Sequence, residues 1–308
     1  MASNKGETIP NGAVMAAMSF IDDNPIFLSE KPYLLLLPGD TDFPPTNCTF
    51  SRYQTVIRDR RSDVGSLSLK EDGFFILHHR FLYPNLRSVV GQESAPEDLL
   101  AYLSEVTALV KDYLGADKAI CIDWRFRKAS PGDSIDVFER DNRTRNDHTP
   151  PAYIAHADLS PRGGWMTLKA YLSEEELSMV LKKQWKAKIV NCWRPLVPAV
   201  HDCPLAYCKP SSIQPQDCVP YDRIDGSTGG EGIFLKTNSD QEWQWVSGQS
   251  CDELSLFQTW DSSPTVVDSF QGQTFHAAFW NPKWDGVGPN RESVEMRLIV
   301  LFNTESRE

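Results

Sequence analysis

Short strand-like segments dominate the chain, and they constrain its fold more than any other feature of the sequence. Nine segments rich in β-branched and aromatic residues are separated by glycine, proline, aspartate, asparagine and serine. They read FFILHHRFLY, AYIAHADLS, KIVNCWRPL, EGIFLKTN, QEWQWVSG, LSLFQTWD, TVVDSF, QTFHAAFW and SVEMRLIVLF. Strands this closely spaced leave little room for the helical crossovers of a parallel sheet. We therefore predict a mostly β fold with a few flanking helices, in the form of a jelly roll or barrel.

Two segments carry helical periodicity instead. Apolar residues recur at helical spacing over 96–114, acidic residues stand near the start, and Gly115 follows as a stop signal. The second predicted helix covers 173–188, where Ser173 and Glu176 form a capping-box pattern and lysines crowd the end. We expect both helices to flank the strands.

We predict that residues 1–308 form a single domain with three parts. Residues 1–50 alternate short apolar runs with turn residues, which predicts an N-terminal wrap laid over the rest. Residues from about 50 to 150 contain the first helix and are expected to support the core. Residues from about 150 to 305 hold most of the strands and are expected to form that core.

Charge and apolar runs exclude several partners. The chain has 31 basic and 42 acidic residues, a formal net charge of −11, so a nucleic-acid backbone would repel it. The apolar run at 33–37 is far too short to span a bilayer, and residues 1–10 show no export-signal pattern. An odd number of cysteines, seven, is typical of reduced thiols. We expect a cytoplasmic protein without nucleic-acid or membrane partners.

Three residues have the types and spacing of a metal site. His156 and Asp158 are two residues apart on a strand-like segment, so both side chains point to one face. A facial triad of two histidines and one carboxylate needs its third ligand from a distant strand, and His276, beside two small alanines, is the natural candidate. Taken singly, the first pair also fits an ordinary hydrogen bond, and His276 also fits a core imidazole.

The last strand-like segment adds a charged face. Four polar residues share that face: Arg291, Ser293, Glu295 and Arg297. Glu295 can pair with one arginine, while the other arginine, helped by the Ser293 hydroxyl, can hold a dicarboxylate with its forked guanidinium. The order His-x-Asp, distal His, Arg-x-Ser is that of iron(II)/2-oxoglutarate oxygenases.

From Val56 to Phe302 the chain resembles the oxygenase-like family typified by gibberellin desaturases and cephalosporin 7α-methoxylase subunits, which is common in fungal secondary-metabolite clusters. The resemblance is carried by HAD at 156–158, VNCWRPL, DCPLAYC, QSCDELSLFQTWDS, TFHAAF and SVEMR. One departure is Lys209, where members often carry an acidic residue. The resemblance implies a double-stranded β-helix, a cupin-like jelly roll.

The resemblance also implies a function. It points to an Fe(II)/2-oxoglutarate-dependent dioxygenase that oxidises a C–H bond of a small secondary-metabolite intermediate by hydroxylation, desaturation or ring closure. Fe(II) would be held by His156, Asp158 and His276, with 2-oxoglutarate and O₂ as cosubstrates. Two alternatives stay open, namely an accessory β-helix subunit of another tailoring enzyme and a cupin-like metalloenzyme that uses no 2-oxoglutarate. A homo-oligomer and a heteromer with another tailoring enzyme also stay open.

Three arginines are candidates to anchor 2-oxoglutarate: Arg297, Arg291 and Arg194. We predict Arg297, because it lies deeper in its strand, whereas Arg291 follows GVGPN and can reach solvent. Arg194 fits either a carboxylate ligand or a brace at the corner between helix and strand.

An apolar substrate pocket and a lid are also predicted. Candidate pocket residues are Trp193, Phe279 and Trp280. The charged run that leads into the His156 segment makes 139–150 a candidate lid.

Overall fold

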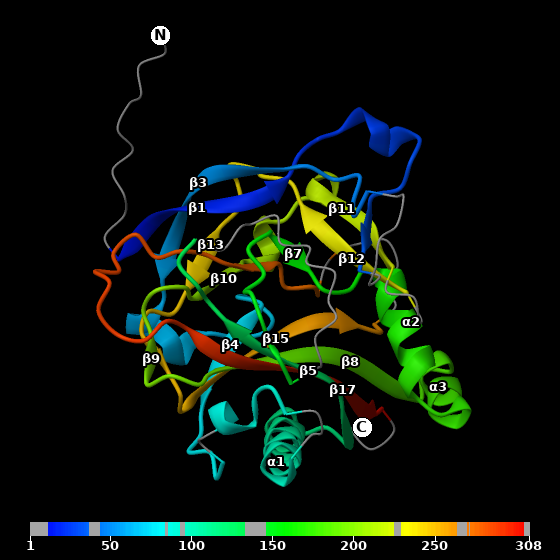
Figure 1. The fold of residues 1–308 in the computed structure, drawn as a ribbon. Helices are drawn as coiled ribbons and strands as arrows, with labels where there is room; N and C mark the ends of the chain where they lie inside the picture. The colour runs from blue at the N-terminus through cyan, green and yellow to red at the C-terminus, as the bar shows by residue number, and fades with distance from the viewer. Residues whose placement is uncertain are drawn as a thin grey trace.

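Two facing sheets build the protein (Figure 1). The computed structural model describes residues 12–36, 44–83, 86–92, 96–132, 146–224, 229–263, 270 and 272–304. A six-stranded sheet has the order β4-β15-β8-β17-β5-β6, and a nine-stranded sheet has the order β1-β3-β13-β10-β16-β7-β12-β11-β2. Strands β9 and β14 form a separate ladder. The prediction of a mostly β fold with flanking helices is confirmed.

The strands are not all short as predicted, since they range from two residues in β7 to twelve in β17. The six-stranded sheet contains β4 (Phe74–His78), β5 (Lys118–Lys128), β6 (His148–Thr149), β8 (Trp185–Pro195), β15 (Glu253–Asp261) and β17 (Glu292–Asn303). The nine-stranded sheet contains β1 (Ala13–Ile21), β2 (Tyr33–Leu35), β3 (Phe50–Asp59), β7 (His156–Ala157), β10 (Leu205–Cys208), β11 (Cys218–Ile224), β12 (Gly230–Leu235), β13 (Trp243–Trp245) and β16 (His276–Ala278). The small ladder joins β9 (Ala199–Val200) to β14 (Gln249–Ser250).

Strand register brings the polar residues of the two sheets to the space between them. β17 is antiparallel to both β8 and β5, and Arg297 lies opposite Asn191 of β8. In the other sheet β7 is antiparallel to β16, and His156 lies opposite His276. Because partners across a ladder point to the same face, each pair presents its two side chains together.

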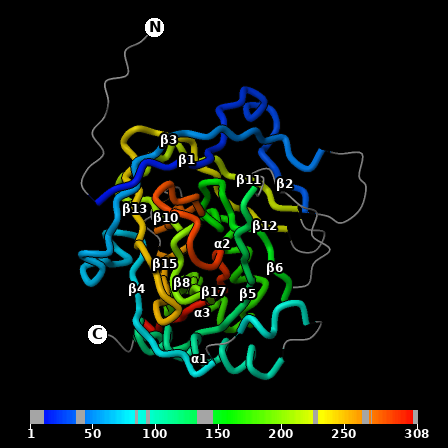
Figure 2. The backbone as a smooth tube through the Cα atoms, turned by 60° about the vertical axis from the view of Figure 1, so that its left-hand side comes forward, coloured from blue at the N-terminus to red at the C-terminus, as the bar shows by residue number. Residues whose placement is uncertain are grey.

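The first predicted helix is confirmed as α1 (Glu97–Leu114). Pro96 is its N-cap, and the chain leaves the helix at Gly115, whose φ of 63° is one that glycine adopts without strain. α1 lies beneath the six-stranded sheet, on the side away from the nine-stranded one (Figures 1 and 2). Its apolar stripe, which includes Tyr102 and Val106, is buried there.

The second predicted helix is wrong at its C-terminal end. α3 (Glu174–Leu181) has the predicted capping box between Ser173 and Glu176. The chain then turns at Lys183, which has a φ of 62°, and enters β8 at Trp185. Residues 185–188 are therefore strand, because they pair with the end of β17.

A further helix, α2 (Pro161–Tyr171), was not predicted. Gly163 and Gly164 weaken its helical signal, yet neither position has room for a side chain. A Cβ at Gly163 would lie 2.1 Å from the carbonyl oxygen of Glu231, and one at Gly164 would lie 2.1 Å from the Trp260 indole nitrogen. The two glycines therefore let α2 pack directly onto the sheets, three residues after Asp158.

The N-terminal strands join the nine-stranded sheet. β1 pairs with β3 along nine residues, and β2 runs parallel to β11. Figure 2 shows β1 and β3 side by side across the end of the molecule opposite α1. The three-part division of the chain stays a prediction.

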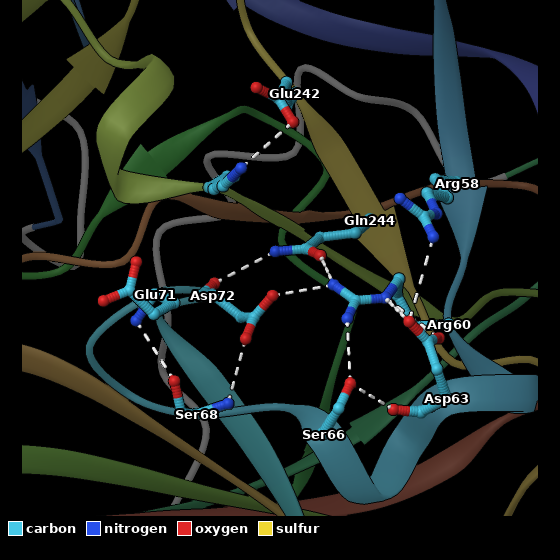
Figure 3. A network of polar contacts seen from close by, with 10 residues as sticks. Arg58, Arg60, Asp63, Ser66, Ser68, Glu71, Asp72, Glu242 and Gln244 are labelled. Carbon is cyan, nitrogen blue, oxygen red and sulfur yellow. Dashed lines mark hydrogen bonds and ion pairs between the residues drawn. The ribbon is translucent and has the colours of Figure 1, made fainter.

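An arginine holds the corner where β3 turns toward β4 (Figure 3). The Arg60 guanidinium contacts the Asp63 carboxylate, lies 2.7 Å from Oδ1 of Asp72, and donates to the Gln244 side chain from β13. The Gln244 amide in turn donates to the Asp72 carbonyl. Nearby, Lys209 lies 3.4 Å from Glu242, which gives it an ion-pair partner.

Parts of two predictions lie outside the described residues. They are 265–269 of the predicted strand TVVDSF at 265–270, and 139–145 of the candidate lid at 139–150. In the part of the chain that is described, no helix is long and apolar enough to cross a membrane.

Candidate metal centre

The structure brings the three predicted metal ligands together. His156, Asp158 and His276 each offer one ligand atom, and these atoms lie within 4.8 Å of one another. Nε2 of His156 is 3.9 Å from Oδ1 of Asp158, and Nε2 of His276 is 3.8 Å from Oδ2. The imidazole rings are 4.4 Å apart between centroids. Two nitrogens and one carboxylate facing a common point are the donor set of a facial triad.

Backbone hydrogen bonds fix which histidine nitrogens face that point. Nδ1 of His156 donates to the carbonyl of Ile154 at 2.8 Å, and Nδ1 of His276 donates to the carbonyl of Thr274 at 3.0 Å. A carbonyl only accepts, so each Nδ1 carries the proton and each Nε2 keeps its lone pair. Such a bond to the remote nitrogen is what orients metal-ligating histidines.

The charges of the site also suit a cation. Burial opposes ionisation of Asp158, yet the Arg297 guanidinium and the two imidazoles outweigh it and hold the pKa of this carboxyl well below its usual range. Burial and the neighbouring His156 lower the pKa of His276 to about 4. At neutral pH the site therefore holds a carboxylate and an uncharged His276 imidazole, the forms that bind metal.

Behind the triad, Asp158 is held by two residues of the six-stranded sheet. Nη2 of Arg297 is 2.7 Å from Oδ1 of Asp158, and Nδ2 of Asn191 donates to Oδ2 at 2.7 Å. Nε of Arg297 donates to Oδ1 of Asn191 at 3.1 Å, which closes a ring of three side chains. A bulge of β17 against β5 falls just after Arg297, and bulges of this kind re-aim side chains beside active sites.

Known proteins are similar to this chain over most of its length, in both sequence and fold. A family model described as "Oxidoreductase/YMDC permease-like domain" matches residues 18–301. The Fe(II)/2-oxoglutarate-dependent dioxygenase nvfI of Aspergillus novofumigatus is 30% identical over 86% of this chain and 87% of its own length. The chain belongs to this dioxygenase family.

Two further comparisons agree. The alpha-ketoglutarate-dependent dioxygenase phiK of a fungal species is 29% identical over 86% of this chain and 92% of its own length. The solved structure of the iron and alpha-ketoglutarate-dependent endoperoxidase NvfI has a TM-score of 0.76 and 25% identity, and it covers 95% of this chain and 99% of that one. The predicted double-stranded β-helix and the oxygenase class of the resemblance are thereby confirmed.

The three candidate arginines of the dioxygenase occupy different environments. Arg291 directly precedes β17 and is buried, whereas Arg297 lies inside that strand and is partly exposed. Arg297 is therefore deeper in the strand, as predicted, but the expectation that Arg291 reaches solvent is wrong. Both Arg291 and the chain before it are tied to Asp202, because the backbone N–H of Asn281 donates to the Asp202 carbonyl and that of Arg291 to its carboxylate.

Arg291 has neutral neighbours around its guanidinium. Nη1 donates to the carbonyl of Cys203 at 3.0 Å, and Nε donates to the hydroxyl of Ser293 at 3.2 Å. The guanidinium carbon lies 4.9 Å from the ring centre of Trp193. Among the described residues, the buried indole Nε1 of Trp193 has no hydrogen-bond partner. This end of the dioxygenase interior therefore combines a cation, a hydroxyl and an unused donor.

Arg194 lies on the other face of β8. Its Nε donates to the carbonyl of Cys251, and its guanidinium carbon lies 3.9 Å from the ring centre of Phe81 and 5.3 Å from that of Tyr102 in α1. The side chain therefore points toward the helix, and the structure does not bring it to the metal centre of the dioxygenase. Its place matches the bracing role considered from the sequence.

Glu295 is paired with a residue that the sequence did not single out. Its Oε1 accepts from Nη2 of Arg127 in β5 at 2.7 Å, and Arg127 also donates to the carbonyl of Pro150. Burial opposes ionisation of Glu295, but Arg127 outweighs it and lowers the pKa. Neither Arg291 nor Arg297 needs Glu295 as its principal partner.

The three aromatic residues predicted to line a substrate pocket lie in different parts of the structure. Trp193 faces the interior beside Arg291. Phe279 packs edge-to-face on Trp245, in an apolar cluster with Ala277, whose side chain alternates with that of His276. Trp280 is half-buried, and its ring pairs with that of Trp284 at 6.2 Å. Only Trp193 of the three is thus seated at the polar interior.

Some residues of the site were not predicted. Asn191 lies in the segment VNCWRPL that supports the family resemblance, but no function was predicted for it from the sequence. Phe257, whose ring centre is 4.6 Å from that of His276, was predicted only as part of a strand. Tyr207 lies opposite His276 in the β10–β16 ladder and stacks on Phe74 at 4.0 Å. An asparagine in an otherwise apolar strand was the usable signal, because strands seldom contain asparagine without a polar partner.

Proposed function

We propose that this dioxygenase oxidises a C–H bond of a small secondary-metabolite intermediate. The observation that carries the proposal is the triad, with two lone pairs at Nε2 and one carboxylate converging on a single point. The nitrogen and oxygen donors fit Fe(II) and leave coordination positions open on the opposite side. In hydroxylation, R–H, O₂ and 2-oxoglutarate give R–OH, succinate and CO₂, the oxidising power coming from the iron-bound cosubstrates.

The surrounding residues have separate tasks in this proposal. His156, Asp158 and His276 would hold the metal, while the ring formed with Asn191 and Arg297 keeps Asp158 ionised. The apolar rings around His276, Phe257 among them, exclude water from the interior. We propose Arg291 with Ser293 as the anchor for the distal carboxylate of 2-oxoglutarate, in place of Arg297.

Three observations support Arg291 as the anchor. Its guanidinium is buried with neutral partners, whereas Arg297 already contacts the Asp158 carboxylate. Ser293 adds a hydroxyl on the same face, and Trp193 adds an unused N–H donor. A buried cation costs free energy unless an anion compensates it. A bound carboxylate therefore stabilises the Arg291 guanidinium more than that of Arg297, which already has an anionic partner.

An anaerobic titration tests the proposal. The apo protein should bind one Fe(II), and addition of 2-oxoglutarate should then produce the visible charge-transfer band of a chelated keto acid. His276→Ala should weaken Fe(II) binding by more than about 100-fold, a larger loss than an outer-shell change causes. Iron binding without the band would favour a cupin-like metalloenzyme, and the band without turnover would favour an accessory subunit.

The proposal also covers the closest chemistry, the cellular location and the assembly of the protein. We propose that the chemistry is nearest to that of gibberellin desaturases and cephalosporin 7α-methoxylase subunits, that the protein works in the cytoplasm, and that it acts alone or as an oligomer. Size-exclusion chromatography with light scattering measures the oligomeric state. Assays with candidate pathway intermediates test the type of chemistry.

A further inference from the structure

Asn191 is placed where a strand would ordinarily carry an apolar residue. It lies in β8 between Val190 and Cys192 and is 4% exposed. A buried amide costs free energy unless its donor and acceptor are both used, and asparagine is a poor strand former. Asn191 uses both, since Oδ1 accepts from Arg297 and Nδ2 donates to Asp158. Its partners therefore explain its presence.

The ring made by Asn191, Arg297 and Asp158 restricts how the arginine reaches the carboxylate. A free guanidinium pairs with a carboxylate as a fork, through two parallel N–H groups. Here Nε of Arg297 is bonded to Asn191, so Nη2 supplies the contact with Oδ1 of Asp158. The amide then supplies the donor for Oδ2. Each carboxylate oxygen is thus held from a different side chain.

This arrangement fixes the direction of the Asp158 carboxylate. Rotation of the carboxylate would break the contact with Arg297 at Oδ1 and the bond from Asn191 at Oδ2 together. The same two oxygens lie 3.9 Å and 3.8 Å from Nε2 of His156 and of His276. Both donors come from the six-stranded sheet, and both imidazoles from the nine-stranded one. The carboxylate therefore keeps its remaining lone pairs aimed at the imidazoles.

We propose that Asn191 is a positioning residue for the metal, which sets the orientation of Asp158 and keeps Nε of Arg297 from joining Nη2 in a side-on fork with the Asp158 carboxylate. The inference rests on the proposed metal-dependent function and adds a residue to it. Without the amide, Nε of Arg297 would be free to join Nη2 in a side-on fork and draw the carboxylate away from the imidazoles. Outer-shell partners of this kind are worth 10- to 100-fold in metal affinity.

The test compares three variants with the natural protein, using Co(II) as a spectroscopic probe under anaerobic conditions. Asn191→Leu removes both hydrogen bonds at similar volume, and Asn191→Thr keeps one hydroxyl donor in a residue suited to strands. The control is Gln244→Ala, which removes another buried amide, two strands away from His276; this amide bonds to Arg60 and Asp72 and to no residue of the triad. Co(II) affinity, the shape of the visible ligand-field band and the apo melting temperature are measured for each.

We expect Asn191→Leu to bind Co(II) about 10- to 100-fold more weakly with an altered band. Asn191→Thr should lie between Asn191→Leu and the natural protein, and Gln244→Ala should lose melting temperature while its metal affinity and band stay unchanged. Natural affinity and band in both Asn191 variants would overturn the proposal. Failure of both to fold while Gln244→Ala folds would overturn it too, because the amide would then serve the strand pairing. Lack of Co(II) binding by the natural protein would instead refute the proposed function.

Discussion

Arg297 lies inside β17 and Arg291 directly precedes that strand, and the protein pairs the two guanidinium groups in opposite ways. Arg297 contacts the carboxylate of Asp158 and is bonded to Asn191. Arg291 is more deeply buried, yet its guanidinium contacts a carbonyl, a hydroxyl and an indole ring, while its backbone N–H donates to the Asp202 carboxylate. A guanidinium that is already paired positions its partner, whereas one with neutral neighbours is prepared for an anion from outside the chain. Burial alone therefore does not identify a ligand-binding arginine.

The largest expected effect comes from Arg291. Arg291→Gln should weaken 2-oxoglutarate binding by about 30- to 1,000-fold, which corresponds to about 2–4 kcal/mol for a lost charge-assisted pair. Fe(II) affinity should stay unchanged, because Arg291 does not touch the triad. The anaerobic charge-transfer band, titrated with 2-oxoglutarate at saturating iron, measures the first quantity. Natural affinity in a variant shown to be folded by circular dichroism would remove Arg291 as the anchor.

The converse change tests the other half of the comparison. Arg297→Gln should weaken Fe(II) binding by about 10- to 100-fold, because the Asp158 carboxylate loses its charged partner. Once iron is saturating, 2-oxoglutarate affinity should stay close to that of the natural protein. If iron affinity is retained and the cosubstrate is lost, Arg297 is the anchor after all and the assignment of the two arginines is reversed.

Much of the fold could be predicted because many of its strands and helices are determined by patterns of neighbouring residues. The strand segments and the helix ending at Gly115 each carry their signal within about twenty residues. α2 could not be predicted, because Gly163 and Gly164 are required by close contacts with Glu231 and Trp260, which are distant in sequence. The end of α3 was missed for a similar reason, because pairing with β17 draws residues 185–188 into a strand.

The site divides in the same way. Two-residue spacing placed His156 beside Asp158, and the sequence order selected His276, so the triad was predictable. Which arginine meets a carboxylate was not, because it depends on how the two sheets face each other. Strand parity correctly put Arg297 on the face of β17 that meets Asn191. It gave no information on the burial of Arg291, which directly precedes that strand.

A smaller effect is expected from Trp193. Trp193→Phe keeps an aromatic ring next to Arg291 but removes the buried Nε1–H, which has no partner in the part of the chain that the structure describes. If that donor bonds the carboxylate held by Arg291, 2-oxoglutarate should bind about 0.5–1.5 kcal/mol more weakly, or about 2- to 13-fold. The same titration measures the change. An unchanged affinity would place the carboxylate away from the indole while leaving the role of Arg291 intact.

The smallest effect is expected from Arg194, which gives the comparison its control. Arg194 is fully buried, and its two terminal nitrogens lack a well-formed hydrogen bond, so by burial and partners alone it would be the better candidate anchor. It lies over Phe81 and Tyr102, on the helix side of β8, and the sheet separates it from the triad. A ligand that chelates the metal cannot reach it there. Arg194→Met should therefore leave 2-oxoglutarate affinity unchanged.

Stability should also change little in Arg194→Met. The stacking on Phe81 contributes about 0.5–2 kcal/mol, and the bond from Nε to the Cys251 carbonyl about 1 kcal/mol. Burying the cation costs several kcal/mol, which methionine avoids while filling similar space. These terms oppose each other, so the free energy of unfolding in urea should shift by less than about 1 kcal/mol. A loss of cosubstrate affinity in this variant would show that the face of the sheet does not decide which arginine binds, and the contrast between Arg291 and Arg297 would lose its basis.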